Sequence, residues 1–342
     1  MTKIPEKAPD IMKTITRRTT LLLAALVAGL PTAASAQAER SITVYTSQPT
    51  EQMAAVIEAF NADHPDITVD LFRSGTTEVM NKLQAEFAAG NVQADVLLIA
   101  DTLAMTKLKE EGRLLAYADA PVDTLPDALV DPDRTFFGTK LITTGIIYNT
   151  DLVETAPASW QDLLAEDVAS SLIMPSPLYS GAAVIHVGTM VQQPEFGWDF
   201  YTALADEGAV AGQGNGSVVE AVARGEKAYG IIIEYMALNA KAKGSPVDFV
   251  FPSEGVSAIT QPVAILKDSD AIEAAKTFVD WQLSAKAQEQ SVEQGYFPVI
   301  EGMAPPAGYP DPASLTILEA DDALMLKDEE ASKREFADLF GG

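Results

Sequence analysis

Short runs of apolar, β-branched residues alternate along this chain with longer runs in which apolar residues recur every three or four positions. The first pattern predicts strands and the second predicts amphipathic helices. Between Ser41 and Gly112 the two patterns alternate three times, which is typical of an open, mostly parallel sheet covered by helices. The expected strands are 41–47, 67–74 and 94–101, and the expected helices are 51–65, 76–91 and 102–112.

The same alternation continues through the second half of the chain and predicts a second α/β unit. A long helix over 271–295 and a charged helical tail over 315–340 follow it. The other expected strands are 140–149, 170–177, 229–235, 247–252 and 256–266, and the other expected helices are 159–167, 181–191, 198–208, 217–226 and 236–244.

Two β-rich segments, 143–151 and 257–266, are expected to carry the chain from one α/β lobe to the other. Two such crossings form a hinge around which a bilobal protein closes on a ligand. Independent domains would instead need a flexible Gly/Ser-rich linker, which the sequence lacks. We therefore expect an N-terminal lobe of 41–142 plus 258–305, and a C-terminal lobe with tail helices of 143–257 plus 306–342.

The first 36 residues have the three parts of a secretory signal peptide: a basic start, an apolar core from Leu21 to Leu30, and a cleavage site at Ala34-Ser35-Ala36. A membrane anchor would need roughly 18 apolar residues, more than this core offers. The Arg17-Arg18 pair partly matches a twin-arginine signal, so both the Sec and the twin-arginine export routes stay open. A periplasmic location is expected.

Charge narrows the choice of partners. The net charge is −26, and removing a segment with five Lys/Arg and two Asp/Glu brings it to −29. Such acidity argues against nucleic acid and anionic membranes as partners, although a local cluster of backbone N–H groups still suits a small anion. We expect a monomer without a cofactor.

The same composition argues against an enzyme. The chain has no cysteine, and its two histidines lie in a predicted turn (His64) and in an apolar helix (His186). It therefore offers no recognisable Ser-His-Asp, Cys-His or His/Cys zinc site. A secreted α/β hydrolase remains a remote alternative.

In open α/β sheets, ligands bind beyond the carboxyl ends of strands, so the strand-to-helix junctions carry the candidate site. Four junctions combine small residues with hydroxyls or amides. The N–H groups of a first helical turn attract anions, and four such helix starts would hold a phosphate, phosphonate or carboxylate without any arginine. Ordinary helix caps use the same residue types. The candidates are Ser47, Gln48, Ser74, Gly75, Thr76, Thr77, Ser180, Gly181, Ala182, Asn215, Gly216 and Ser217.

The strand expected over 229–235 runs through three isoleucines into Glu234 and Tyr235. We predict that these two residues, with Asp101, face the cleft and read the rest of the ligand. A phenol donates a hydrogen bond or lies against a cation, and a carboxylate pairs with an ammonium group. Alternatively, Tyr235 only closes the core at the end of the strand.

The residues resemble those of the substrate-binding proteins of ABC importers. The likeness rests on ITVYTS, QADVLLIAD, PSPLYSGAA, VVEAVARGEKAYGIIIEY and the segment from Gln261 to Val299. It points to the cluster that takes ferric iron, sugar phosphates or 2-aminoethylphosphonate. The resemblance implies a two-lobe periplasmic receptor that closes on a small solute and delivers it to a membrane permease with an ATPase subunit.

Ferric members of this family hold iron with two consecutive tyrosines, where this chain has Glu234-Tyr235-Met236. A hard Fe(III) ion needs several anionic oxygen ligands, and here only Tyr235, with Glu234 and Asp101 as substitutes, would supply them. The family's anion-binding positions are kept at Ser180-Gly181-Ala182 and Asn215. We therefore expect a phosphonate or phosphate ester as ligand, with ferric iron as the alternative.

Overall fold

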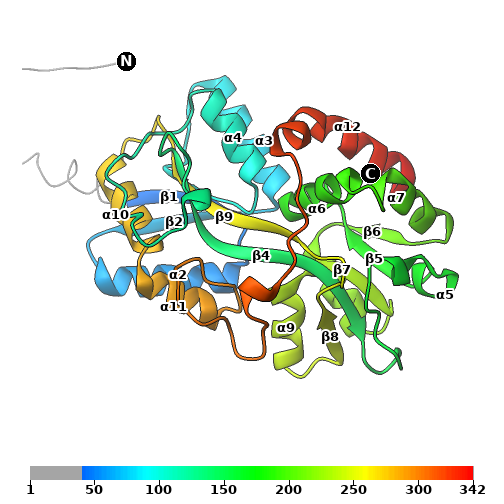
Figure 1. The fold of residues 1–342 in the computed structure, drawn as a ribbon. Coiled ribbons are helices and arrows are strands. Elements are labelled where there is room, and N and C mark those ends of the chain that lie inside the picture. The colour runs from blue at the N-terminus through cyan, green and yellow to red at the C-terminus, as the bar shows by residue number, and fades with distance from the viewer. Residues whose placement is uncertain (1–40, 342) are drawn as a thin grey trace, which may run out of the picture. The chain divides into compact units, whose positions relative to one another are not determined.

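The structure is a computed structural model that describes residues 41–341 (Figure 1). The predicted signal peptide lies outside the described residues. In the first half of the fold, β1 (Ser41–Thr46) pairs in parallel with both β2 (Thr68–Arg73) and β3 (Val96–Leu98). Helices α2 (Thr50–Asp63), α3 (Thr76–Ala89) and α4 (Thr102–Glu110) follow the three strands in turn. The strand–helix alternation predicted for this part of the chain is confirmed.

Two long strands join the halves of the sheet. β4 (Phe136–Asn149) and β9 (Ser257–Ile265) run antiparallel, from Phe136 opposite Ala264 to Thr144 opposite Ser257. β9 also pairs with β3, and β4 also pairs with β7 (Tyr229–Ile233). The sheet order is β2-β1-β3-β9-β4-β7-β5-β6, so both strands serve both halves. The predicted lobe boundaries remain a prediction.

The second half repeats the parallel arrangement. β5 (Leu172–Pro175) pairs in parallel with β7 and with β6 (Val210–Gly212), while β8 (Val247–Val250) lies antiparallel to β4. β6 was not predicted, because three residues around Ala211 are too few for an alternating pattern. The helices of the second half are α6 (Gly181–Gln192), α7 (Gly197–Asp206), α8 (Asn215–Ala223) and α9 (Glu234–Ala242).

Several predicted elements differ at their ends. The helix expected over 271–295 is two, α10 (Ile272–Gln282) and α11 (Ala285–Glu293), because the Ser284 side chain accepts a hydrogen bond from Ala287 N and starts a new helix. The tail helix α12 (Asp322–Phe340) begins only after its cap Asp321. The segment 159–167 forms a 3₁₀ turn (Gln161–Leu164) and the start of the short α5 (Glu166–Ala169); further 3₁₀ turns are Asp127–Leu129 and Pro312–Ser314.

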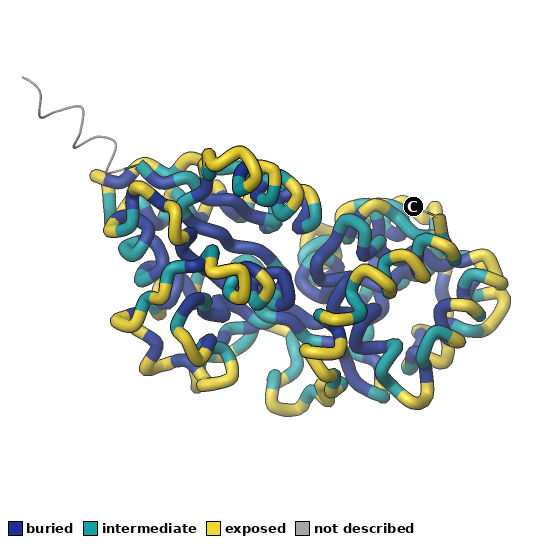
Figure 2. The backbone as a smooth tube through the Cα atoms, turned by 90° about the horizontal axis from the view of Figure 1, so that it is seen from above, coloured by how far each residue is buried: buried dark blue, intermediate teal, exposed yellow. Residues whose placement is uncertain are grey.

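Burial follows the sheet. Figure 2 shows buried backbone along the strands and exposed segments on the outer faces of the helices. In the first half, Phe60 packs edge-on against Phe278 and Trp281. In the second half, Phe336 of α12 packs against Tyr201, so the terminal helix belongs to that core.

No helix within residues 41–341 is both long and apolar enough to cross a membrane.

His186 is part of this core. The residue is 3% exposed, its Nδ1 lies 2.9 Å from Ser257 Oγ, and its ring packs against Trp160. Burial lowers the pKa of His186 to about 3, so the ring is neutral at physiological pH. A residue placed this way holds α6 against β9 and has no access to a substrate.

The buried His186 should make the protein sensitive to acid. The unfolded chain protonates this residue below its ordinary pKa of about 6.5, whereas the native state keeps it neutral to about 3. Stability should therefore fall as the pH drops through this window, by up to about 1.4 kcal/mol per pH unit from this group. Urea unfolding between pH 7 and 4 should show a shallower decline in His186→Gln; an unchanged slope would contradict the assignment.

Candidate functional site

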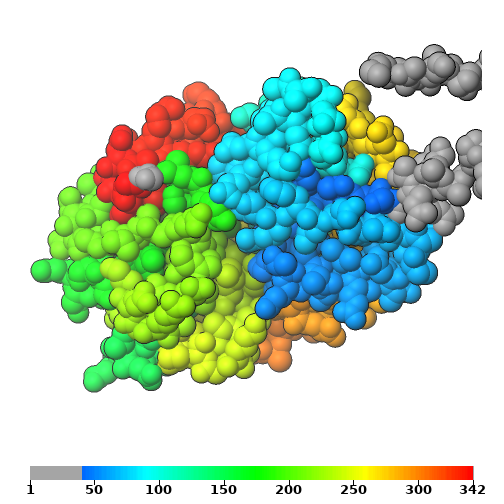
Figure 3. Space-filling model, turned by 180° about the vertical axis from the view of Figure 1, so that it is seen from behind, coloured from blue at the N-terminus to red at the C-terminus, as the bar shows by residue number. Residues whose placement is uncertain are grey.

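A cavity of about 350 Å³ lies where the strand-to-helix junctions of the two halves meet. Figure 3 shows the surface hollowed between the first-half segments near α2 and the second-half segments of α8 and α9. Ile142 of β4 and Gln261 of β9 line it from the two shared strands. The cavity is therefore built by both halves, as expected from the rule that ligands bind beyond the carboxyl ends of the strands.

Most of the predicted site residues line this cavity, and five do not. The lining includes Ser47, Gln48, Gly75, Thr76, Ser180, Ala182, Asn215, Gly216, Ser217 and Tyr235. Ser74, Thr77, Gly181, Asp101 and Glu234 lie next to the cavity or behind its wall.

The second-half side of the cavity is made by two helix starts. Ser180 caps α6, where its Oγ accepts hydrogen bonds from Ala183 N and from Asn215 Nδ2, at 3.3 and 3.1 Å. Asn215 Oδ1 in turn accepts from Ile233 N. This network fixes the start of α8 beside that of α6. The positive ends of two helices thus converge on one place, which suits an anion.

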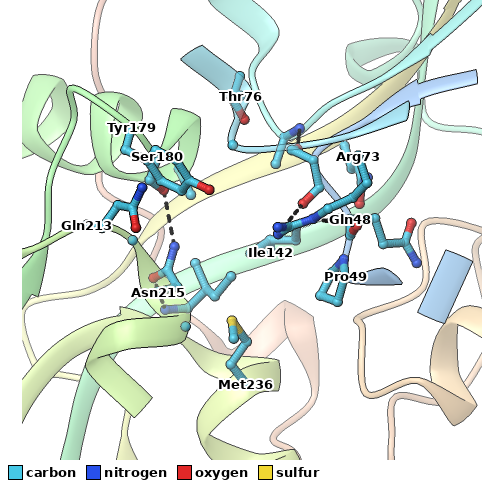
Figure 4. Close-up of a pocket in the computed structure, with 18 of the residues that line it drawn as sticks. Gln48, Pro49, Arg73, Thr76, Ile142, Tyr179, Ser180, Gln213, Asn215 and Met236 are labelled. Atoms are coloured by element: carbon cyan, nitrogen blue, oxygen red, sulfur yellow. Dashed lines mark hydrogen bonds between the residues drawn. The ribbon is translucent and has the colours of Figure 1, made fainter. Parts of the chain in front are cut away.

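The first-half side carries a cation that the sequence reasoning missed. Arg73 ends β2, and its guanidinium donates to the main-chain carbonyls of Gln48 and Ser47, at 3.2 and 3.4 Å. Within residues 41–341, Arg73 forms no ion pair with a carboxylate. Figure 4 shows Arg73 and Gln48 across the cavity from Ser180 and Asn215. The cavity therefore offers an arginine in addition to the helix starts that the sequence predicts.

Tyr179 was also missed, and it explains two of the glycines. A Cβ atom added to Gly75 would lie 2.5 Å from the Tyr179 ring, and one added to Gly214 would lie 2.9 Å from it. The main-chain carbonyl of Tyr179 also accepts from Thr77 N. Tyr179 thus joins a first-half junction to a second-half junction, and only glycine leaves room for its ring.

Gly181 marks another close approach between the halves. Its added Cβ would lie 2.6 Å from the carbonyl oxygen of Ala100 and 2.9 Å from Asp101 Cβ. Asp101 is 5% exposed and caps α4 by accepting from Ala104 N at 2.9 Å. Burial raises the pKa of this carboxyl to about 7. Asp101 therefore supports the junction from behind and does not line the cavity.

Glu234 and Tyr235 begin α9 and do not continue the strand, so their side chains diverge. Glu234 is fully buried, and its Oε2 accepts from Thr143 N at 2.7 Å. Burial raises the pKa of Glu234 to about 8. Tyr235 lines the cavity and packs on Tyr296, with ring centroids 4.2 Å apart, and burial raises its pKa to about 12. Only the phenol can touch a ligand in this arrangement.

The remaining lining is apolar or neutral. Ile142 and Met236 lie between the two polar sides (Figure 4), and Ile233 also lines the cavity. No His, Asp or Glu lines the cavity, and residues 41–341 contain no group of three or more His, Asp or Glu placed to hold a metal ion. The site can therefore hold an anion at its polar sides and a short carbon skeleton between them.

Comparison with known proteins agrees with this geometry. Residues 46–289 match the family model described as bacterial extracellular solute-binding protein. A curated relative, a probable ABC transporter periplasmic-binding protein from Sinorhizobium fredii, is 28% identical over 274 residues, which are 76% of this chain and 74% of the relative.

Two solved structures are similar in fold. The periplasmic binding protein AfuA from Actinobacillus pleuropneumoniae, with fructose-6-phosphate bound, superposes with a TM-score of 0.80 at 22% identity, covering 88% of this chain and 98% of AfuA. Iron-bound HitA from Pseudomonas aeruginosa gives a TM-score of 0.76 at 21% identity, covering 86% of this chain and 99% of HitA. The two-lobe α/β fold is thereby confirmed.

Proposed function

We propose that this chain, which belongs to the bacterial extracellular solute-binding protein family, captures a small organic anion of the phosphonate or phosphate ester type between its lobes. The ligand would then pass to the permease and ATPase subunits of an ABC importer. The family and the relatives above are substrate-binding transport proteins, and this chain is not an enzyme. Family membership implies export, while the signal peptide remains a prediction.

The observation that carries the proposal is Arg73. In a chain with a net charge of −26, an arginine that forms no ion pair with a carboxylate of residues 41–341 faces the positive ends of α6 and α8 across a small cavity. A guanidinium binds phosphate oxygens in a bidentate manner with charge-assisted hydrogen bonds. Ser180, Asn215 and the main chain of Gly216 and Ser217 would bind the same group from the other side.

The carbon skeleton of the ligand would occupy the part of the cavity between the polar sides. Ile142 and Met236 give it apolar contact, and the Tyr235 phenol donates a hydrogen bond to a hydroxyl or lies against an amine. Glu234 would act from behind the wall, through Tyr235, and Ser47, Gln48, Gly75 and Thr76 would shape the first-half side.

Ferric iron is the competing ligand, and the donor set favours the anion. The phenols of Tyr179 and Tyr235 line the cavity, whereas the carboxyls of Glu234 and Asp101 do not. Fe(III) needs several anionic oxygens around it. Two phenols opposite an unpaired arginine provide a poor site for a trivalent cation.

A thermal-shift screen tests the proposal. The ligands are fructose 6-phosphate, 2-aminoethylphosphonate, inorganic phosphate and ferric citrate, each added to dialysed protein. A ligand at 100 times its dissociation constant should add about 2.7 kcal/mol of stability. We expect a phosphate or phosphonate to raise the melting temperature. A shift with ferric citrate alone, accompanied by a visible charge-transfer band lost in Tyr235→Phe, would establish iron instead.

A further inference from the structure

Lys140 is a buried cation beside the proposed site. It lies in β4, is 1% exposed, and its Nζ donates a hydrogen bond to Gln48 Oε1 at 2.9 Å. The same Nζ lies 4.6 Å from the centre of the Tyr296 ring. Within residues 41–341, Lys140 forms no ion pair with a carboxylate.

Burying an ammonium group without a counter-ion is unfavourable, and one amide oxygen with one ring face offsets only part of the cost. The folded protein therefore loses stability by keeping a lysine here. An apolar side chain of similar length would fill the space without this penalty. A charge retained at such a cost points to a ligand that completes the site.

Gln48 connects Lys140 to the cavity. Its side-chain amide is held in one orientation, because Nε2 donates to Gln294 Oε1 at 3.0 Å while Oε1 accepts from Lys140. Its main-chain carbonyl accepts from Arg73. Gln48 itself lines the cavity. Two unpaired cations, one buried and one exposed, are thus attached to a single residue of the first-half junction.

We propose that Lys140 is the buried counter-cation of the anion site: it positions Gln48, and its protonation is coupled to binding of a dianionic ligand. The inference rests on the proposed function and adds a second positive charge to the site. A phosphate or phosphonate dianion near Gln48 favours the ammonium form, so the protein takes up a proton as it binds.

The titratable and charged groups around Lys140 determine whether the affinity for the anion rises or falls with pH. Burial lowers the pKa of Lys140 to about 7, so the ligand-free protein loses this proton as the pH rises above neutrality. Tyr296, which packs over Lys140, stays neutral because burial raises its pKa well above the usual value. Tyr235, whose ring packs on that of Tyr296, stays neutral because burial raises its pKa to about 12. Glu234 loses its proton near pH 8 and adds negative charge, so it weakens anion binding in the same direction.

Calorimetry with fructose 6-phosphate and 2-aminoethylphosphonate between pH 7.5 and 9 tests whether protonation of Lys140 is coupled to ligand binding. A phosphate monoester has a second pKa of about 6, so it stays dianionic throughout this pH range. We expect the affinity of the wild-type protein to fall by up to about tenfold per pH unit, as linkage to one proton requires. Lys140→Met should bind at least about tenfold more weakly at pH 7.5, lose most of the pH dependence, and melt at a higher temperature without ligand.

Two further variants separate the contribution of Lys140 to the affinity and its pH dependence from the contributions of other charged groups. Lys243→Met removes the same charge from an exposed position after α9 and should keep both the affinity and the slope of the wild type. Glu234→Gln removes the other nearby titration and should keep the slope that belongs to Lys140. Wild-type affinity and slope in Lys140→Met would overturn this inference and leave the proposed function intact.

If Lys140→Met does not fold, Glu234→Gln still decides the question, because it lacks the second group whose titration would add to the proton count. Titrations at pH 8 in buffers of different ionisation enthalpy measure the protons taken up on binding, and we expect close to one. No net uptake, with binding intact, would overturn the role of Lys140. A wild-type protein that binds neither probe would overturn the proposed function and this inference together.

Discussion

Replacing Arg73 with glutamine is expected to weaken phosphate or phosphonate binding by about 10- to 100-fold. Hydrogen bonds to charged groups contribute about 1.5–3 kcal/mol each, and Arg73 supplies the exposed positive charge on the first-half side of the cavity. Its side chain is exposed and donates hydrogen bonds to two main-chain carbonyls, so the free energy of unfolding should change little. Calorimetry of the ligand from the screen, with urea unfolding in parallel, checks both parts.

The contribution of Arg73 to the affinity depends on the geometry of its guanidinium as well as on its charge. Arg73→Lys tests the two separately. Lysine keeps the charge and loses the fork that binds two oxygens, so an intermediate affinity is expected. Arg224→Gln removes another exposed arginine, which pairs with Glu220 at the far end of α8, and this variant should bind as the wild type does. Equal affinities for all three variants and the wild type would mean that the anion binds elsewhere.

The junctions were predictable because their chemistry is local. A helix start needs Ser, Asn, Thr or Gly whether or not a ligand is present, so residues such as Ser180 and Asn215 stand out in the sequence. Parallel strands then bring these starts to one edge of the sheet, which the alternating pattern already indicates. Fold class and most of the cavity lining follow from these two rules.

The missed residues depend on contacts between distant segments. Arg73 looks like any polar end of an edge strand until β1 places Gln48 beside it. The Tyr179 ring packs against glycines of two different junctions, and Lys140 donates a hydrogen bond to Gln48. No short-range pattern contains such pairs. Arg73 and Gln48 meet through the pairing of β1 with β2, whereas the contacts of Tyr179 and Lys140 form only once the full sheet is assembled.

The predicted position of Glu234 failed for a different reason. The isoleucine run predicts a strand correctly, but the strand ends at Ile233 and Glu234 begins the helix. A change from strand to helix rotates the next side chains by about 100° per residue instead of 180°. Glu234 consequently turns to Thr143 N and Tyr235 turns to the cavity. The strand expected to end at residue 235 ends two residues earlier, and the carboxylate expected to face the cavity is buried behind its wall.

Replacing Gly181 with alanine should impair closure of the two halves on the ligand. The added Cβ would lie 2.6 Å from the main-chain oxygen of Ala100 and 2.9 Å from Asp101 Cβ, and backbone cannot move aside as a flexible side chain does. Both contacts run from α6 to the first half. The clash therefore opposes the close approach of the two halves and leaves the hydrophobic core of each half intact. We expect affinity to fall by at least about tenfold, which corresponds to about 1.4 kcal/mol against the closed state.

Small-angle scattering distinguishes impaired closure from a local loss of binding. With saturating ligand, Gly181→Ala should keep a larger radius of gyration than the wild type, whereas Arg73→Gln should contract normally once enough ligand is present. Gly90→Asn is the matched control: Gly90 has a φ of +65°, which asparagine tolerates, and no atom within 4 Å of an added Cβ. Normal contraction and affinity in Gly181→Ala would mean that the approach of α6 to Ala100 is not part of the ligand-bound state. Closure would then have to depend on other contacts between the halves, such as those of Tyr179 with Gly75 and of Leu103 with the second-half core.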